Sequence, residues 1–290
     1  MVVKIGPILT YASCITCVAI FLTTSAGEGA RSWEQLSSVG YFPASAIWDG
    51  AYWALWRTVF VHLSFWHLGF NLWWLWVLGS TVEQKVRRVL WLTLFVMAAA
   101  ISSSAQLAAS GDTGVGASGV VYGFFGFVLV TRRNFPEFEQ LASKSNVTLL
   151  IAWLALGIPM TYFGILSVGN AAHVAGLVAG SLVGLAVYAR RHKAAYRLAL
   201  AVLILSSLIP LFWAPWSVDW MGLQAYRAHS EGEYERAVEW YTAILEHDPI
   251  NAWALYNRGV AFENLGMQPE ADRDIGLAMH LDPNIAAPTQ

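Results

Sequence analysis

The chain has 290 residues, of which 57% are hydrophobic and only 12% are charged, and its formal net charge is −2. Soluble domains carry about 25% charged residues, so this composition excludes an ordinary soluble protein and indicates a polytopic helical membrane protein. A net charge this small gives no basic field for nucleic acid, and no nucleic-acid partner is expected.

Seven apolar runs predict seven membrane-spanning helices, because a span needs about 20 predominantly apolar residues. The spans are expected at residues 5–25, 63–81, 89–109, 117–131, 147–166, 171–189 and 196–214. Pro210 and Pro215 mark positions where the last helix can kink or end early. If that helix does not cross, the tail lies on the other side of the membrane.

Basic residues are unevenly distributed between the connections, and this sets the expected orientation. Only Arg31 and Arg57 lie in the connections of one side. Because basic loops stay in the cytoplasm, we expect a cytoplasmic N terminus and, after seven spans, a tail outside. Residues 23–27 also resemble a signal-peptide cleavage site, but the loop charges fit an uncleaved helix. The cytoplasmic basic residues would be Lys4, Lys85, Arg87, Arg88, Arg132, Arg133, Lys144, Arg190, Arg191, Lys193 and Arg197.

Residues 26–61 form a long connection rich in tryptophan and tyrosine, without obvious regular structure. These side chains favour the membrane interface, so the segment is expected to fold against the outer surface; a simple aromatic belt is the alternative. Cys14 and Cys17, both in the first run, are expected to be buried small hydrophobic residues and not a redox pair.

From Asp219 onward the composition becomes that of a soluble protein, and two segments align with an offset of 34 residues. This period, with small residues where helices would touch, resembles the tetratricopeptide repeat. Two copies are fewer than the three usually needed, so the tail is expected to pack on the membrane domain, a second copy or a partner. A protein or peptide ligand is expected; a stabilising cap without a ligand is the alternative. The aligned pairs are Ala225 with Gly259, Gly232 with Gly266, Ala237 with Ala271, Asp248 with Asp282, and Pro249 with Pro283.

Polar side chains gather at the outer ends of three spans. Ser118 begins the fourth, His173 begins the sixth, and the second begins with a group of polar residues. Polar groups at bilayer depth are costly and usually mark function. A serine becomes a nucleophile when a base takes its proton, so His173 is predicted to activate Ser118. No acidic residue lies near these helix ends, which predicts a dyad.

Donors for a developing oxyanion are expected from His67 and Asn71, which are spaced i, i+4, and from the Ser118 N–H. His62 lies off that face and is expected to shape the loop before the helix or to hold water. Tyr122, one turn after Ser118, is predicted to stack on the imidazole of His173.

Two G-x-x-x-G steps predict close packing of the serine and histidine helices. Gly119 and Gly123 form one step, and Gly176 and Gly180 form the other.

Together these elements resemble the rhomboid family of intramembrane serine proteases over about residues 5–190. The resemblance implies a six-helix core, Ser118 as nucleophile, His173 as general base, and an oxyanion site of His67, Asn71 and the Ser118 amide. It also implies Tyr122 beneath His173, and single-span membrane proteins as substrates that enter past the fifth span. Four signatures carry it: Trp56-Arg57; His62-x4-His67-x3-Asn71 with Gly79 and Glu83; Gly116-Ala117-Ser118-Gly119 with Tyr122-Gly123; and Ala172-His173-x2-Gly176-x3-Gly180.

The expected organisation is all-α: a membrane core in residues 1–190, a seventh transmembrane helix in 191–216, and a repeat tail in 217–290. The expected location is a bacterial inner membrane with the tail in the periplasm. No cofactor or metal is expected, and Glu83 is expected to brace its helix end against Lys85 or Arg87.

Two other functions stay open. One is a catalytically silent relative that binds membrane clients, although Ser118 and His173 are both present. The other is a transporter. Acidic residues within the spans would favour it, and this sequence has none there.

Overall fold

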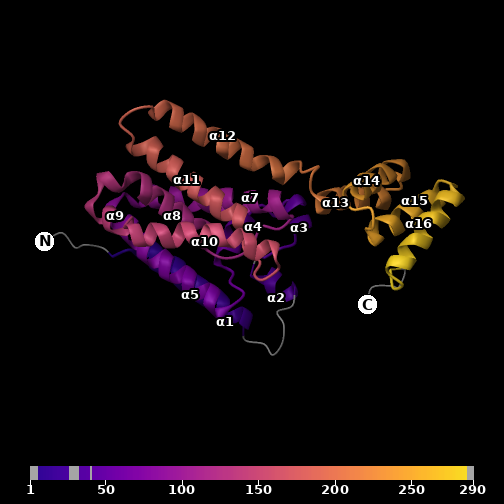
Figure 1. Cartoon of the computed structure of the whole chain (residues 1–290), viewed down its shortest axis with the longest axis horizontal. Helices are drawn as coiled ribbons and strands as arrows, with labels where there is room; N and C mark the ends of the chain where they lie inside the picture. The colour runs from indigo at the N-terminus through magenta and orange to yellow at the C-terminus, as the bar shows by residue number, and fades with distance from the viewer. Residues whose placement is uncertain (1–5, 26–32, 40, 286–290) are drawn as a thin grey trace. The chain divides into compact units, whose positions relative to one another are not determined.

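The computed structural model describes residues 6–25, 33–39 and 41–285, and every regular element within these ranges is a helix (Figure 1). The predicted all-α class is confirmed. Residues 26 and 27 of the suggested cleavage site, and the predicted cytoplasmic Lys4, lie outside the described residues. The chain forms two compact units, one up to Phe212 and one from Trp213 onward, and each is described by itself.

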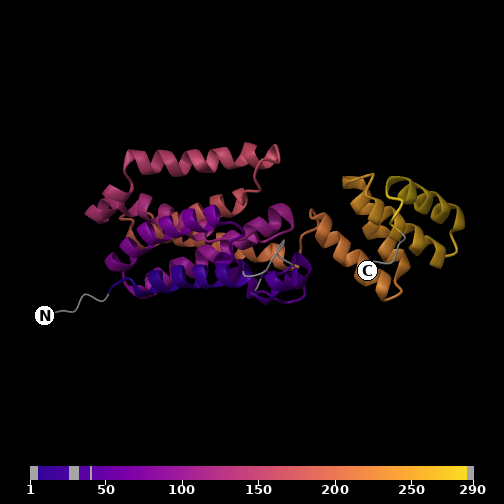
Figure 2. The ribbon, with the colours of Figure 1, turned by 90° about the horizontal axis from the view of Figure 1, so that it is seen from below.

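The first unit is a helical bundle in which each expected span coincides with a helix or a continuous helical rod. Four of these helices, α7, α10, α11 and α12, are long and apolar enough to cross a membrane. Pro210 does not end α12, which continues to Phe212. In Figure 2, α10 lies at the margin of the bundle, and few of its residues are buried. The elements are α1 (Ile8–Ser25), the rod α5 (Phe65–Trp74), η2 (Leu75–Gly79) and α6 (Ser80–Lys85), then α7 (Arg88–Ser110), α8 (Ser118–Thr131), α10 (Lys144–Tyr162), α11 (Asn170–Tyr188) and α12 (Lys193–Phe212).

Helix α8 forms the centre of the bundle, and every residue from Gly119 to Val128 is buried. Its 14 residues, at about 1.5 Å each, give a length of about 21 Å. The apolar layer of a bilayer is about 30 Å thick. The helix is therefore shorter than that layer, and Arg132 and Arg133 follow its end opposite Ser118. At the basic end, η3 (Arg132–Asn134) and α9 (Pro136–Leu141) connect α8 to α10.

Glycines let α8 and α11 pack backbone to backbone. A methyl group on Gly176 would overlap the carbonyl oxygen of Gly119, and one on Gly180 would overlap that of Gly123. The close approach predicted from the two G-x-x-x-G steps is confirmed. This contact fixes the starts of the two helices, where Ser118 and His173 lie, against one another.

The rod that follows the first loop contains a π-helical stretch, Leu75–Gly79, between two α-helical ends. The indole Nε1 of Trp91 on α7 donates to the carbonyl oxygen of Gly79 at 2.9 Å. A π turn holds one residue more than an α turn and is often found at functional sites. Upstream of it lie His67 and Asn71, and downstream lies Glu83.

Glu83 fastens the lower end of this rod to α1. Its buried carboxylate accepts hydrogen bonds from two backbone N–H groups in the first turn of α1 and from the Thr10 hydroxyl, at 2.8 to 3.0 Å. The Nε of Arg88 lies 3.7 Å away. The expected pairing with Lys85 or Arg87 is therefore wrong, and Lys85 instead binds a glutamate of α9.

The loop between the first two spans contains short helices that the sequence analysis did not predict. Each is a turn or two long, too short to show a periodic pattern. The loop packs among the helices: Trp48 Nε1 donates to Pro210 O at 2.9 Å, and Ser103 Oγ donates to Leu55 O at 2.9 Å. The elements are α2 (Trp33–Ser38), α3 (Ala44–Trp48), α4 (Ala54–Arg57) and η1 (Thr58–Phe60).

The second unit consists of two helical hairpins, each turning at a glycine with positive φ, Gly232 at 80° and Gly266 at 73°. Small residues lie where the helices touch, as predicted. Ala237 and Ala271 are fully buried, and a Cβ on Gly259 would lie 2.6 Å from Ile275 Cγ1. The helices are α13 (Val218–Ser230), α14 (Tyr234–His247), α15 (Ala252–Asn264) and α16 (Gln268–Leu281).

A buried ion pair joins the last two helices of this unit. Arg258 Nε lies 2.6 Å from the carboxylate of Asp274, which is almost fully buried. A second guanidinium nitrogen of Arg258 donates to Thr242 Oγ1 at 3.0 Å, and Arg273 Nε also contacts Asp274, at 3.3 Å. The carboxylate is therefore well compensated.

Candidate active site

Ser118 and His173 face one another at the first turns of α8 and α11. The Oγ of Ser118 lies 2.7 Å from the Nε2 of His173, whose side chain is buried. This distance is that of a strong hydrogen bond, in which the serine hydroxyl donates to a neutral imidazole. Both helices direct their N-terminal ends, which carry partial positive charge, toward this place.

The other ring nitrogen of His173, Nδ1, is buried and has no hydrogen-bond partner among the described residues. A neutral imidazole whose Nε2 accepts carries its proton on Nδ1. The ring is supported instead by Tyr122, whose ring centroid lies 4.7 Å from that of His173 at an interplanar angle of 30°. The Tyr122 hydroxyl donates to Leu150 O on α10 at 2.8 Å. The imidazole is therefore held by stacking on Tyr122, without a hydrogen bond at Nδ1 from the described residues.

Gly116 lies two residues before Ser118, against His67 and Asn71. Its φ is +99°, a conformation that residues with a side chain rarely adopt. A Cβ there would lie 2.5 Å from His67 Nε2 and 3.4 Å from Asn71 Nδ2. Asn71 Nδ2 donates one hydrogen to His67 O at 2.9 Å, and its amide has a second N–H. Gly116 belongs to the connection between α7 and α8, residues 111–117, here called the serine loop. Only glycine fits at this position, because the side chains of His67 and Asn71 lie against its backbone.

His62 connects the first loop to the serine loop. It is fully buried, its Nδ1 lies 3.1 Å from Phe60 O, and its Nε2 accepts the N–H of Ala117 at 3.3 Å. These contacts require the tautomer with hydrogen on Nδ1. His62 therefore joins the loop before α5 to the residue next to Ser118.

Two amide side chains near the dyad were missed by the sequence analysis. Gln106 of α7 accepts the N–H of Ala172, the neighbour of His173, at 3.2 Å. Asn170 donates from Nδ2 to Gly157 O and to Thr161 Oγ1 of α10, both at 3.1 Å. Together they fix the start of α11. A polar residue within an apolar span, as Gln106 is, was a signal that could have found it.

Comparison with known proteins adds independent information. A family model described as a rhomboid domain matches residues 49–190, and one described as a TPR repeat matches residues 225–266. The rhomboid protease GlpG of Haemophilus influenzae is 33% identical over 168 residues, which are 58% of this chain and 84% of the relative. The chain belongs to the rhomboid family.

Two further relatives named rhomboid protease GlpG match this rhomboid over a smaller share of their length. That of Serratia proteamaculans is 34% identical over 200 residues, 66% of each chain. That of Pectobacterium atrosepticum is 34% identical over 187 residues, 62% of each chain. The predicted resemblances to rhomboids and to tetratricopeptide repeats are confirmed. The rhomboid match ends two residues after α11, so α12 and the repeat unit lie beyond it.

The candidate site residues all lie inside the matched range, on the loops before α5 and α8 and on α5, α8 and α11. With its long apolar helices, the protein is an integral, multi-pass membrane protein.

Proposed function

We propose that this rhomboid is an intramembrane serine endopeptidase in which Ser118 is the nucleophile and His173 is the general base. The observation that carries the proposal is the 2.7 Å contact between Ser118 Oγ and His173 Nε2, held between two closely packed helix starts. A hydroxyl needs a base at this distance to attack a carbonyl carbon.

In the first step the Ser118 oxygen attacks the peptide carbonyl while its proton passes to His173 Nε2. The imidazolium formed lies over the Tyr122 ring, which attracts a cation through its π face. His173 then gives the proton to the leaving amine, and an acyl-enzyme remains on Ser118. A water molecule, deprotonated by the same nitrogen, releases the acid and restores the hydroxyl.

The negative charge that develops on the carbonyl oxygen would be held by donors around Gly116. We assign this role to the second N–H of the Asn71 amide and to a ring N–H of His67, because both side chains lie against Gly116. The backbone N–H of Ser118 is among the first four of α8, which have no partner inside the helix. Loss of one such donor typically slows an acyl transfer by about 10²–10³-fold.

The substrates of the proposed reaction are single-span membrane proteins. Ser118 begins its short helix below the membrane surface, so a peptide bond inside the bilayer can reach it. A helical backbone hides its carbonyls in hydrogen bonds, and the segment must unwind locally. Access past α10 fits the marginal position of that helix in Figure 2.

The basic connections support an orientation with the N terminus in the cytoplasm of a bacterium, the site near the outer face of the inner membrane and the tail in the periplasm. For the tail, we propose a protein or peptide ligand that selects substrates. Deletion of residues 219–290 should then leave the dyad reactive and change which substrates are cut. Loss of dyad reactivity on deletion would show that the tail is structural.

A fluorophosphonate probe tests the dyad without a known substrate. Wild type should be labelled, whereas Ser118→Ala and His173→Ala should not. Ser181→Ala is the matched control, because Ser181 lies on α11 with its hydroxyl bonded to its own helix at Leu177 O. Label on Ser118→Ala, or on His173→Ala at the wild-type rate, would exclude the proposed dyad.

A further inference from the structure

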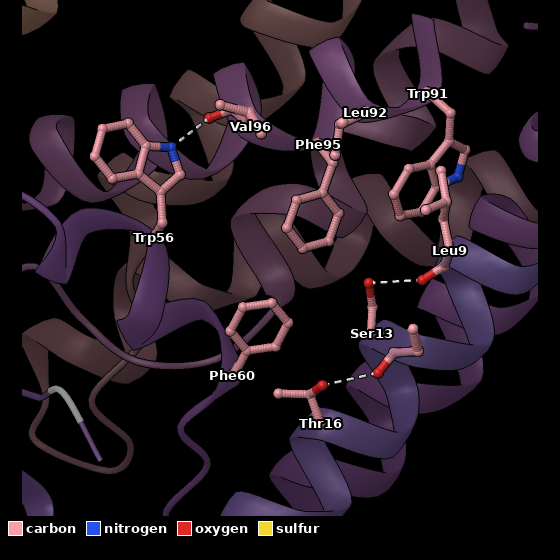
Figure 3. Close-up of a pocket in the computed structure, with 10 residues that line it drawn as sticks. Leu9, Ser13, Thr16, Trp56, Phe60, Trp91, Leu92, Phe95 and Val96 are labelled. Atoms are coloured by element: carbon pink, nitrogen blue, oxygen red, sulfur yellow. Dashed lines mark hydrogen bonds between the residues drawn. The ribbon is translucent and has the colours of Figure 1, made fainter. Parts of the chain in front are cut away.

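A groove of about 430 Å³ lies between α1 and α7, and it shares no lining residue with the dyad (Figure 3). Leu92 and Val96 line it from α7, and Trp56 and Phe60 line it from the first loop. The only hydroxyls in its wall, those of Ser13 and Thr16, donate to carbonyls of their own helix at 2.9 Å. The groove therefore presents an apolar surface with no free hydrogen-bond donor.

The length of the groove suits one lipid tail. On α1 its lining begins at Leu9 and ends at Thr16, about 10 Å at the helical rise of 1.5 Å per residue. Half of the ~30 Å apolar layer gives a tail of one leaflet about 15 Å of depth, so an extended hydrocarbon chain can run along the whole groove.

A cation lies on α7 one helical turn before Leu92 of the groove lining. Arg88 precedes Leu92 by four residues and Val96 by eight, so the three share one face of α7. Its side chain is 45% exposed, and it lies at the membrane end of α7, next to the exposed Arg87. Its Nε lies 3.7 Å from the Glu83 carboxylate, and a second guanidinium nitrogen donates to Gly6 O at 3.4 Å. A guanidinium has five N–H donors, so these contacts leave others for an anion one turn beyond the apolar groove.

We propose that this groove binds one acyl chain of an anionic phospholipid, with the phosphate at Arg88. A lipid tail in the bilayer is already in apolar surroundings, so its transfer into the groove gains little hydrophobic free energy. Selectivity comes from the headgroup charge, and a filled groove restores the dispersion contacts that an empty one lacks. In the proposed orientation the lipid comes from the cytoplasmic leaflet, where anionic headgroups attract basic residues.

The bound chain would also support the serine loop. Trp56, at the loop end of the groove, donates from Nε1 to Val96 O at 3.1 Å, as Figure 3 shows. Two residues later, the carbonyl of Thr58 accepts the N–H of Gly116 at 3.0 Å. An acyl chain that packs against Trp56 therefore steadies the segment that holds Gly116 in place.

Native mass spectrometry of the full chain in detergent tests the proposal with two lipids that have the same chains, phosphatidylglycerol and phosphatidylethanolamine. One phosphatidylglycerol should be retained about fivefold more tightly, the effect of one basic residue beside an anionic headgroup. Ala12→Phe, which fills the groove, should remove this retention. Ala19→Phe, on an exposed position of the same helix outside the groove, should keep it.

A second pair from the other wall keeps the test informative if Ala12→Phe does not fold. Leu92→Trp should remove the retained lipid, and Val89→Trp, exposed on the same helix outside the lining, should not. Arg88→Gln should leave the two lipids equally bound. Wild-type retention in both groove-filling variants, or equal affinity of the wild type for both lipids, would overturn the proposal.

Discussion

Replacement of Gly116 by alanine tests the proposed oxyanion site, because the added methyl group would displace the His67 ring. An added Cβ would lie 2.5 Å from His67 Nε2 and 2.6 Å from Cε1, whereas such contacts stay above about 3.0 Å. The His67 ring must therefore withdraw by about 0.5–0.9 Å. A displacement of this order at a reacting centre costs about 10²-fold in rate. We expect Gly116→Ala to slow fluorophosphonate labelling about 100-fold. Its positive φ should also lower stability by about 1–2 kcal/mol.

Gly114→Ala separates these two effects. Gly114 also has a positive φ, +66°, but a Cβ there would meet only the flexible side chain of Gln106, at 3.3 Å. This variant should lose about 1–2 kcal/mol of stability in thermal unfolding and still be labelled at nearly the wild-type rate. If both alanine variants are labelled equally fast, displacement of the side chains at Gly116 does not slow the reaction. The proposed oxyanion site of His67 and Asn71 beside Gly116 is then refuted.

Three more predictions follow from the same contacts. Asn71→Ala should lower kcat toward a transmembrane substrate about 10²–10³-fold with little change in KM; an unchanged kcat would remove Asn71 from the oxyanion site. Tyr122→Phe keeps the ring under His173 and loses the bond to Leu150 O, so thermal unfolding should show a loss of about 1 kcal/mol with labelling retained, whereas Tyr122→Leu should label more slowly. Arg258→Met removes the buried ion-pair partner of the Asp274 carboxylate and should destabilise the repeat unit by about 3 kcal/mol, measured as faster amide hydrogen exchange in α16 of the full chain. The double variant Arg258→Met with Asp274→Leu should recover most of the lost stability.

Hydropathy was enough to predict the membrane helices, because a membrane span is apolar over about 20 consecutive residues. The glycine steps predicted the α8–α11 contact for a similar reason, since the spacing that matters is local. Ser118 and His173 could be proposed as partners because each begins a helix on the same expected side, and the structure places them 2.7 Å apart.

Contacts between segments far apart in the chain could not be predicted from the sequence. Glu83 was assigned to neighbouring cations, yet it binds the start of α1, more than 70 residues earlier. Nothing in the local pattern of residues around Glu83 distinguishes a backbone N–H acceptor from an ion-pair partner. The same holds for Asn170, whose hydrogen bonds join the start of α11 to α10, and for His62, whose bond to Ala117 depends on how two loops meet.

The π-helical stretch Leu75–Gly79 separates two tasks that one rod performs. The extra residue is taken up within one wide turn, so each residue beyond it lies one position, about 100°, from its place in an uninterrupted α-helix. The lower part of the rod can thus present Glu83 to α1, while the upper part presents His67 and Asn71 to the serine loop. Removing one residue within Leu75–Gly79 would let this turn close as an α turn, with Glu83 and the two site residues left on the same sides of the rod. The wide turn therefore sets which sides of the rod carry the anchor and the site, since the same residues wound as an uninterrupted α-helix would turn the two ends about 100° apart.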